Sequence, residues 1–466
     1  MIFAAPIFVL WFLPLALIAD RVLPRRARCA GLLVMSLIFY GWWRVDFLFL
    51  LIGSTILDWG MGLWIDHVKE DRKRKLLVAI SVLANLGVLC WFKYADFGIA
   101  SFNSAIAMGA SLLGLATPTP SPLLHIVLPI GISFYTFQSM SYVIDVYRRH
   151  VTPTKNFIEY AAFVSLFPQL VAGPIVRFRE LEQGFRNPDR SPSMIWNGVI
   201  AFQLGLAKKV LIADTIAPIA DRCFADGSLG FGDAWVGALA YTFQLYFDFS
   251  GYSDMAIGLG GMLGLRFPAN FNAPYSANSI TDFWRRWHIS LSSWLRDYLY
   301  IPLGGNRGTT TRTYLNLVMT MLLGGLWHGA NWTYVVWGAW HGTWLAVEKA
   351  LGVDPLRTGW HRTLGTFLLV VIGWVFFRSL DLTSALTTLG VMFGMRGFSP
   401  PNFATYAQPE ALAFIAAVLC TWMLPRVADI VKAGKPPAMI ATSILFVIGF
   451  CHLYFQQYAP FLYFQF

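Results

Sequence analysis

Two histidines stand in a long uncharged part of the chain, each at the centre of a Trp-His-Gly tripeptide, at 327–329 and 340–342. No Asp, Glu, Lys or Arg occurs between Arg312 and Glu348. A buried imidazole is expected to be neutral, because burial disfavours its charged form. A neutral imidazole can accept a proton, and a general base typically raises a rate by about 10²–10⁴-fold. Each histidine could instead be structural, bonding a neighbouring group of its helix.

The segment that carries both histidines, Thr313–Val347, is too long for a single helix across a membrane. At ~1.5 Å per residue it would extend about 52 Å, whereas the hydrocarbon core is ~30 Å thick. We therefore expect a break at Gly324–Gly325 or at Gly329–Asn331, and the second break would put His328 at a helix end. Even on a continuous helix His341 would lie ~220° away. The two histidines need separate explanations, and we expect His341 to be structural or to line a cavity.

A third histidine, His288, lies in the most patterned stretch of the chain, Asp282–Tyr298. At ~100° per residue, the large apolar side chains of this stretch share one face about 100° wide, and His288 lies on that face. We expect one amphipathic helix, with His288 either above a cavity or bonded to a neighbouring carbonyl. The Gly-Gly-Asn-Arg-Gly at 304–308 could hold a phosphate through backbone NH groups and arginines. It could also be an ordinary turn, which we favour.

Two carboxylates, Asp248 and Asp254, also stand in an apolar segment, on either side of Ser250–Gly251. Ionisable residues inside a membrane are rare and tend to be functional. The pair could form a cation or proton site, as a transporter would need. It could equally pair with arginines such as Arg285 or Arg286 and hold the core together, and we favour this structural role.

Composition indicates a membrane protein. Of the 466 residues, 56% are hydrophobic and 13% are charged, against roughly a quarter charged in a soluble domain. The net charge of +10 is concentrated in loops, and no basic run is interleaved with aromatic residues, so nucleic-acid binding is not indicated. The five cysteines are scattered without metal-ligand spacing, so we expect no metal site. No GxSxG, P-loop or HExxH motif points to a serine hydrolase, an ATPase or a zincin.

Hydrophobic runs predict an all-α, polytopic fold with roughly 11–13 membrane segments, in a single domain covering 1–466. The apolar Met1–Ala19 is expected to be a retained first span, because no basic region precedes it and no cleavage site follows. Phe157–Pro174 lies between two basic clusters, so we expect it to enter the membrane and return. Such re-entrant backbone requires surrounding protein or a water-filled cavity.

The positive-inside rule predicts which loops face the cytoplasm. We assign the basic clusters to the cytoplasmic side and three stretches without basic bias to the outside, and the last span, Ala438–Leu453, returns the chain to the outside. The basic clusters are Arg21–Arg28, His67–Lys75, Arg148–Lys155, Arg177–Arg190, Lys208–Lys209, Arg307–Arg312 and Arg426–Lys435, and the outer stretches are Asp96–Leu123, Asp221–Asp233 and Met395–Pro409.

The segments that carry His288 and His328, Asp282–Arg307 and Gly324–Trp332, closely resemble the long motifs of the membrane-bound O-acyltransferase (MBOAT) family. The resemblance is narrower still to its bacterial branch of alginate O-acetylation proteins, and it runs nearly end to end. Relatives of that branch D-alanylate teichoic acid or O-acetylate peptidoglycan and cellulose. Supporting matches are Tyr40–Arg44, Leu128–Gln138, Val171–Ile175, Phe247–Ala256 and the closing Pro460–Phe466.

The resemblance implies a many-helix domain around a tunnel across the membrane. An acyl thioester would enter the tunnel from the cytoplasm, and the acyl group would leave to an acceptor on the far side or in the membrane. The family's near-invariant histidine falls on His328, and its second motif position, Asn or His in different branches, falls on His288. His328 would act as general base on the acceptor hydroxyl or position the acyl group, and His288 would orient the thioester.

We therefore expect an O-acetyltransferase, a multi-pass protein of the bacterial inner membrane, that serves an exported polysaccharide such as alginate. Trp327, Asn331, Trp284 and Arg285 are expected to bind substrate. The donor would be acetyl-CoA, with no permanently bound cofactor, and a separate periplasmic acetyltransferase would receive the acetyl groups. The alternatives are D-alanyl or other acyl transfer from a carrier protein, and a polysaccharide or ion transporter.

Overall fold

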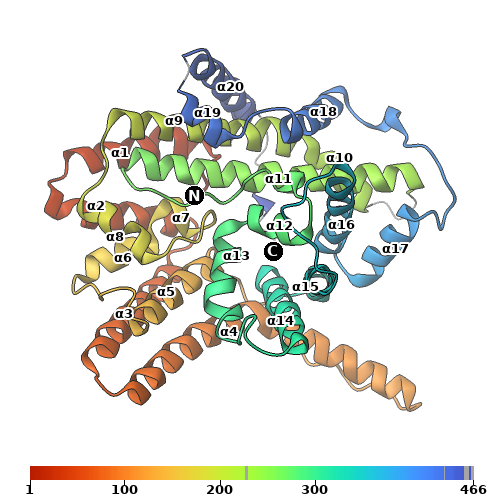
Figure 1. Cartoon of the computed structure of the whole chain (residues 1–466), viewed down its shortest axis with the longest axis horizontal. Helices are drawn as coiled ribbons and strands as arrows, with labels where there is room; N and C mark the ends of the chain where they lie inside the picture. Colours follow the sequence, from red (N-terminus) through yellow and green to blue (C-terminus); the bar gives the residue numbers. More distant parts are fainter. Residues whose placement is uncertain (226–228, 435, 456–460, 463–466) are drawn as a thin grey trace.

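The computed structural model describes residues 1–225, 229–434, 436–455 and 461–462, and in these residues the chain forms helices and no strand. The all-α prediction is confirmed. The helices, labelled as in Figure 1, are α1 (Leu13–Val22), α2 (Arg25–Gly41), α3 (Asp46–His67), α4 (Asp71–Leu112), α5 (Ile132–Tyr147), α6 (Phe157–Ser165), α7 (Phe167–Leu170), α8 (Phe178–Arg186), α9 (Pro192–Ala207), α10 (Asp214–Ala225), α11 (Phe231–Met262), α12 (Ile280–Arg286), α13 (Ile289–Leu295), α14 (Thr310–His328), α15 (Trp332–Ala350), α16 (Trp360–Arg378), α17 (Leu382–Met392), α18 (Gln408–Trp422), α19 (Val427–Ala433) and α20 (Pro436–Phe455).

Three of the described helices, α3, α4 and α16, are each long and apolar enough to cross a membrane. Helices α18 and α19 would together make a fourth crossing, although they are bent by 66° relative to each other. Many of the remaining helices are shorter or interrupted, as where α9 continues through the π-helical turn Lys208–Ala213 into α10. The helices agree with a polytopic membrane protein, while the number of eleven to thirteen membrane segments stays a prediction.

Helices α9 and α11 run side by side across the upper half of the view in Figure 1. Glycines make this close packing possible. A Cβ atom at Gly205 would lie 2.5 Å from the Gly251 carbonyl oxygen, and one at Gly258 would lie 2.6 Å from the Gly198 carbonyl oxygen. Small residues let membrane helices bring their backbones close in this way. The pair therefore forms a centre against which α10, α16, α17, α18 and α20 pack.

The buried charges of this centre pair with lysines. Lys209 Nζ lies 2.5 Å from Asp214 Oδ1 and 2.8 Å from Asp248 Oδ1, and Lys208 Nζ lies 2.7 Å from Asp254 Oδ2. The prediction that these carboxylates pair with arginines such as Arg285 or Arg286 is wrong in its partners, because α9 and α11 pack so closely that the end of α9 faces the carboxylates. Paired buried charges of this kind fit the structural role that we favoured.

Basic residues from separate sequence regions gather at one end of the molecule, which we call the basic end. Arg28 is buried and donates to the backbone oxygens of Gly184, Phe185 and Leu263 at 3.2, 3.3 and 2.7 Å, and to Asp20 at 2.6 Å. These contacts join the α1–α2 junction to the ends of α8 and α11. Three of the chain's turns are thus held together at this end.

The basic end also contains the α3–α4 junction and the end of α5. Arg74 Nη2 donates to the Tyr147 carbonyl oxygen at 2.9 Å, and Arg148 Nη1 donates to the Asp297 carbonyl oxygen at 3.1 Å. Arg177, which directly precedes α8, pairs with Asp297 Oδ2 at 2.8 Å, so α8 links the two groups of turns. The gathering of these clusters agrees with the prediction that they face the same side of a membrane.

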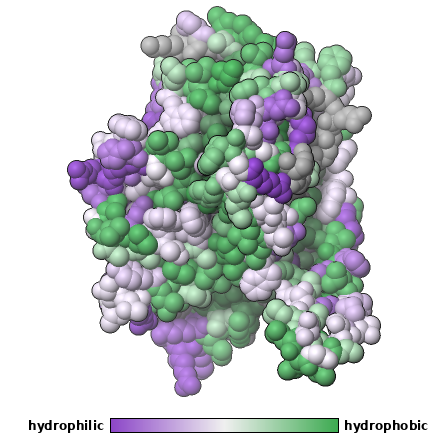
Figure 2. All heavy atoms as spheres, turned by 90° about the vertical axis from the view of Figure 1, so that its right-hand side faces the viewer, coloured by the Kyte–Doolittle hydropathy of each residue, from purple (hydrophilic) through white to green (hydrophobic). Residues whose placement is uncertain are grey.

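Two of the three predicted outer stretches, Asp221–Asp233 and Met395–Pro409, meet at the opposite end of the molecule. Arg378 Nη2 lies 2.8 Å from Asp221 Oδ1, and Asp233 Oδ1 accepts from the Asn402 backbone NH at 2.9 Å and from Tyr406 Oη at 2.8 Å. Residues 226–228, within the outer stretch Asp221–Asp233, and residue 435, at the end of the basic cluster Arg426–Lys435, lie outside the described residues. Figure 2 looks onto the right-hand side of Figure 1, where hydrophobic side chains cover broad areas and hydrophilic ones form separate patches.

The segment predicted to be re-entrant, Phe157–Pro174, forms the short helices α6 and α7. Neither is long enough to cross a membrane, and almost every residue of the segment is buried. Beyond α7 the chain returns to the basic end at Arg177. The tip of the segment, near Leu170 and Val171, approaches Gly131 so closely that a Cβ atom there would lie 2.4 Å from the Leu170 carbonyl oxygen. This agrees with the re-entrant prediction.

Candidate active site

The chain reverses direction directly after His328. Helix α14 ends at His328, Gly329 is extended with φ −160° and ψ 152°, and α15 begins at Trp332 with Asn331 as its N-cap. The Asn331 side chain accepts a hydrogen bond from the Thr333 NH at 3.1 Å, as N-cap residues do. The predicted break at Gly329–Asn331 is therefore confirmed, and it places His328 at a helix end.

The other candidate break, Gly324–Gly325, lies inside α14 and serves helix packing instead. A Cβ atom at Gly325 would lie 2.2 Å from the Tyr334 carbonyl oxygen, and one at Gly338 would lie 2.4 Å from the Met321 carbonyl oxygen. Glycines thus bring α14 and α15 together as an antiparallel hairpin. This packing fixes the direction in which the end of α14, and hence His328, points.

Aromatic rings surround the His328 imidazole. Its side chain is nearly buried, at 4% exposed, and the ring centroids of Trp327, Trp337 and Phe377 lie 5.0, 5.1 and 5.3 Å from its own. The three rings meet the imidazole edge-on, an arrangement that fixes its orientation. The site therefore presents one well-placed imidazole in an apolar setting.

His288 reaches the same site from a break in another helix. The predicted single helix over Asp282–Tyr298 is wrong, because α12 ends at Arg286 and α13 begins at Ile289. Between them Trp287 is extended, and His288 has φ 43° and ψ 53°, in the left-handed region.

A neighbouring loop replaces the helical hydrogen bonds that are lost at this break. The Ile289 NH donates to the Asn270 carbonyl oxygen at 2.9 Å, and the Ser290 hydroxyl donates to Asn270 Oδ1 at 2.9 Å. The Asn272 NH in turn donates to the Arg286 carbonyl oxygen at 2.9 Å. Tertiary contacts thus override the helical pattern of the sequence.

The two histidines that the family resemblance selected lie next to each other. The ring centroids of His288 and His328 are 6.4 Å apart, and His288 is fully buried. Phe249 of α11 packs edge-on against His288 at 4.7 Å, and the Trp327 ring lies 6.1 Å from it. The two imidazoles thus belong to one site, although they come from separate helix ends.

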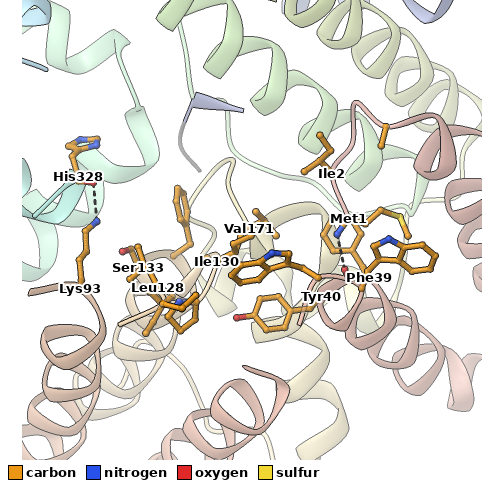
Figure 3. A pocket seen from close by; sticks show the side chains of 18 of the residues that line it. Met1, Ile2, Phe39, Tyr40, Lys93, Leu128, Ile130, Ser133, Val171 and His328 are labelled. Atoms are coloured by element: carbon orange, nitrogen blue, oxygen red, sulfur yellow. Dashed lines mark hydrogen bonds between the residues drawn. The ribbon is translucent and has the colours of Figure 1, made fainter. Parts of the chain in front are cut away.

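A cavity of about 570 Å³ opens beside His328 (Figure 3). It is lined by the first residues of the chain, the end of α2, the start of α5 and the end of α14. Both α2 and α5 have their other ends at the basic end, so the cavity lies toward the far side of the molecule. Lining residues include Ile2, Tyr40, Trp43, Leu128, Ser133 and Val171.

One residue beside His328 was not predicted from the sequence. Lys93 of α4 lines the cavity, and its Nζ donates to the carbonyl oxygens of Trp327 and His328 at 2.6 and 2.9 Å (Figure 3). The sequence does distinguish this residue, because Lys93 is the only charged residue between Lys75 and Asp96. A lone charge in an apolar helix marks a functional or packing site.

The four predicted substrate-binding residues do not all meet at His328. Trp327 does, and its ring also packs on those of Phe134 and Phe137 at 5.3 and 5.4 Å. Asn331 lies in the adjacent turn, but its side chain caps α15 and donates to the Leu380 carbonyl oxygen at 2.7 Å. Its amide is thus occupied by structural bonds, although the residue lies close to the site.

The other two predicted residues, Trp284 and Arg285, are placed differently. Trp284 packs against Trp337 and His341, with centroid distances of 5.7 and 5.3 Å, so it belongs to the rings around His341. Arg285 is exposed. The break at His288 explains this placement, because it separates α12 from the helix that the sequence pattern assumed.

His341, the second Trp-His-Gly histidine, is fully buried inside α15. Within the described part of the chain, neither of its ring nitrogens has a hydrogen-bond partner. The rings of Phe283, Trp284 and Trp337 enclose it at 6.0, 5.3 and 5.1 Å. We expected His341 to be structural or to line a cavity. It is not among the residues that line the cavity beside His328, and its enclosure by rings agrees with the structural alternative.

The glycine-rich segment 304–308 is a closed turn at the start of α14. Gly304 and Gly305 have φ of 113° and 53°, and Asn316 Nδ2 donates to the carbonyl oxygens of Leu303 and Gly305 at 3.3 and 3.2 Å. Glycine adopts these angles without strain. The segment thus forms the ordinary turn that we favoured over a phosphate-binding loop. Among the described residues, no three His, Cys, Asp or Glu side chains are grouped as a metal site would require.

Comparison with known proteins identifies the class. Residues 148–376 match the model of the MBOAT family, membrane-bound O-acyltransferases. Together with relatives that are similar over the whole chain, this match shows that the protein belongs to that family. Both histidines of the site lie within the matched region, whereas Lys93 lies before it. Of the closing family motif, 460–466, only residues 461 and 462 are among the described residues.

The names of the individual relatives specify O-acetylation, which is narrower than the activity of the family as a whole. The chain is 45% identical to the probable alginate O-acetylase AlgI of Azotobacter vinelandii, with 100% of both chains covered. It is 53% identical to the protein of the same name in Pseudomonas aeruginosa, over 84% of this chain and 75% of the relative. A peptidoglycan O-acetyltransferase of Helicobacter pylori is 35% identical over 100% of this chain and 98% of its own length. The protein is a membrane O-acyltransferase.

Proposed function

We propose that this protein transfers acetyl groups from a cytoplasmic thioester, acetyl-CoA, through the membrane for O-acetylation of an exported polysaccharide such as alginate. The observation that carries the proposal is the juxtaposition of two buried histidines, His288 and His328, of which His328 lines a cavity that faces away from the basic end. The names of the full-length relatives support acetyl as the group and a polysaccharide as its destination. The whole chain would act as one domain in the bacterial inner membrane.

The basic end is where the donor would approach. Exposed or half-exposed arginines near α8, such as Arg148, Arg179 and Arg186, could neutralise phosphate groups of a nucleotide thioester. The acetyl group would travel inward past His288, whose imidazole would hold the thioester carbonyl in line with the acceptor. Trp327, stacked in place by Phe137, would form one wall of this path.

His328 would supply the proton transfer. Its neutral imidazole would take the proton from the acceptor hydroxyl as the hydroxyl oxygen attacks the acetyl carbonyl carbon. The carbon–sulfur bond then breaks, and the imidazolium returns its proton to the leaving thiolate, so that a free thiol and a new ester result. The acceptor would reach His328 from the cavity, either as a hydroxyl of a periplasmic acetyltransferase or as the polysaccharide itself.

The test uses inverted membrane vesicles, in which the cytoplasmic face is outside, supplied with labelled acetyl-CoA. Wild-type vesicles should release the thiol and transfer label at least 10²-fold faster than vesicles with His328→Ala, because a general base contributes about that much. His361→Ala, on the exposed start of α16, is the matched control and should transfer at the wild-type rate. Equal rates for wild type and His328→Ala would refute the proposal.

A cellular measurement addresses the destination of the acetyl group. A deletion strain should export polysaccharide without acetyl ester, and the wild-type gene should restore the ester whereas His328→Ala should not. An unchanged ester content in the deletion strain would contradict the assignment to that polysaccharide. Loss of D-alanyl ester from the envelope instead would favour transfer from a carrier protein, the activity for which a 29% identical relative in Streptococcus thermophilus is named.

A further inference from the structure

The end of α14 lacks the usual means of closing a helix. The last carbonyl groups of a helix have no partner within it, and many helices bind them by turning the next residue into the left-handed conformation. Helix α4 ends in this way: Gly114 has φ 66°, and the Leu115 NH donates to the Ala110 carbonyl oxygen at 2.8 Å. At the end of α14, Gly329 is extended instead. The carbonyls next to His328 therefore need other donors.

Two adjacent side chains of α4 supply those donors. Tyr94 Oη donates to the Leu326 carbonyl oxygen at 2.6 Å, and Lys93 Nζ donates to the carbonyl oxygens of Trp327 and His328 at 2.6 and 2.9 Å. Three successive carbonyls are thus bound by residues more than two hundred positions away in the sequence. A cation at this place is also favoured by the partial negative charge at a helix C-terminus.

The position of Lys93 is costly unless it serves a purpose. It lies in an apolar part of α4, a helix long and apolar enough to cross a membrane, where an ammonium group loses most of its hydration. Figure 3 shows its side chain extending from α4 to the backbone of His328, along the wall of the cavity. The charge and the imidazole thus meet at the same wall, through the backbone that carries the imidazole.

We propose that Lys93 and Tyr94 are positioning residues for acetyl transfer: they hold the last turn of α14 so that the His328 imidazole points correctly at the cavity. The inference rests on the role of His328 proposed above. Without these donors the last turn would loosen, and the imidazole would lose its fixed place between Trp327 and Trp337. Misplacement of a catalytic group by about 1 Å can lower a rate by about 10²-fold.

The test compares variants in membrane vesicles with labelled acetyl-CoA, measuring kcat and KM separately. Lys93→Met keeps the unbranched side chain but removes all donors, and should lower kcat by about 10–100-fold with little change in KM for acetyl-CoA. Lys93→Arg restores donors and charge, and should recover most of that loss. Tyr94→Phe removes one of the three bonds and should lower kcat by about 3–10-fold. Lys349→Met, on the exposed end of α15 and outside the basic clusters, should leave both constants unchanged.

Wild-type kcat in Lys93→Met would overturn the inference, as would equal losses in Lys93→Met and Lys93→Arg, which would indicate a purely structural role. If Lys93→Met does not accumulate in the membrane, Tyr94→Phe decides, and a wild-type kcat in that variant overturns the inference. His328→Ala keeps the two proposals apart: if it stays active, the proposed function fails. If it is inactive while Lys93→Met is fully active, only the positioning role fails. Polysaccharide ester content in cells gives the same comparison without assuming the donor.

Discussion

The two Trp-His-Gly copies have the same three residues and opposite surroundings. His328 ends a helix, faces a cavity and lies 6.4 Å from another histidine, whereas His341 lies within α15, closed in by rings. Trp337 stands between them, with its centroid 5.1 Å from each imidazole. The backbone break, and not the tripeptide, therefore creates the candidate reactive position.

The residue after each histidine shows how this difference arises. Gly329 ends α14 in an extended conformation, while Gly342 continues α15 and packs on α14, where a Cβ atom would lie 2.9 Å from the Val318 Cα. One glycine interrupts a helix and the other brings two helices together. Each tripeptide position can therefore be tested against its counterpart.

The largest expected difference is at the histidines. His328→Ala should lower acetyl transfer by about 10²–10⁴-fold while the protein still accumulates in the membrane. His341→Ala should keep the rate per folded molecule within a few fold, but lower the unfolding free energy by about 1–3 kcal/mol because it leaves a void among packed rings. Labelled acetyl transfer and thermal melting in detergent measure the two effects. Similar losses of rate in both variants would contradict the different roles assigned to His328 and His341.

The tryptophans should differ less. Trp327 is buried against Phe134 and Phe137, so Trp327→Ala should cost about 3–5 kcal/mol of unfolding free energy and most of the activity. Trp340 is half-buried, and its main polar contact is a hydrogen bond from Nε1 to the Leu369 carbonyl oxygen at 2.9 Å. Trp340→Ala should cost about half as much and keep activity. Melting temperatures and acetyl transfer of both variants, measured side by side, check the order.

The glycines should separate stability from activity. At Gly329 a Cβ atom would lie 2.0 Å from the Tyr334 ring, so Gly329→Ala should displace that ring and lower both activity and stability. Gly342→Ala should cost about 1–3 kcal/mol by overpacking two helices and affect activity little. Gly365→Ala on α16 should be neutral or slightly stabilising, because a Cβ atom there would meet no atom of another element within 4 Å. A loss of activity in Gly342→Ala equal to that in Gly329→Ala would contradict this.

The smallest effect is expected at Asn331, the cap between the two copies. Asn331→Ala removes the bond to the Thr333 NH and should lower the unfolding free energy by about 1 kcal/mol. Asn331→Asp keeps the capping oxygen and should restore most of that loss. If Asn331→Ala lowers kcat by more than 10-fold with unchanged melting, Asn331 contacts the substrate, as the sequence suggested, and its role is not only structural.

Sequence reasoning succeeded where a single segment carried enough information. The uncharged Thr313–Val347 was too long for one crossing, and its Gly-Ala-Asn marked the break that the structure contains. Length and glycine placement are local properties, so they can be read without knowing the rest of the fold. The four basic clusters between Arg21 and Arg190 likewise gather at one end, as predicted. Lys208–Lys209, which we also assigned to the cytoplasmic side, instead pairs with Asp254 and Asp248 within the helix packing.

It failed where distant residues decide the local structure. His288 sits in a left-handed turn because Asn270 and Asn272 bind the neighbouring backbone, and nothing in Asp282–Tyr298 itself predicts that. Lys93 stands out in the sequence as a lone charge in an apolar stretch, but its partners, the backbone oxygens of Trp327 and His328, could not be predicted from a residue pattern. The lysine partners of Asp248 and Asp254 were missed for a related reason, since only the packing of α9 on α11 reveals them.

The contacts of Lys93 also have a consequence for the order of assembly during synthesis. The α14–α15 hairpin joins neighbouring segments and can form as soon as both have been made, since local contacts form fastest. The bonds from Lys93 and Tyr94 span more than two hundred residues, and their donors are synthesised first. The hairpin therefore docks onto an α4 that is already in the membrane, so that His328 acquires its final orientation only in this late step.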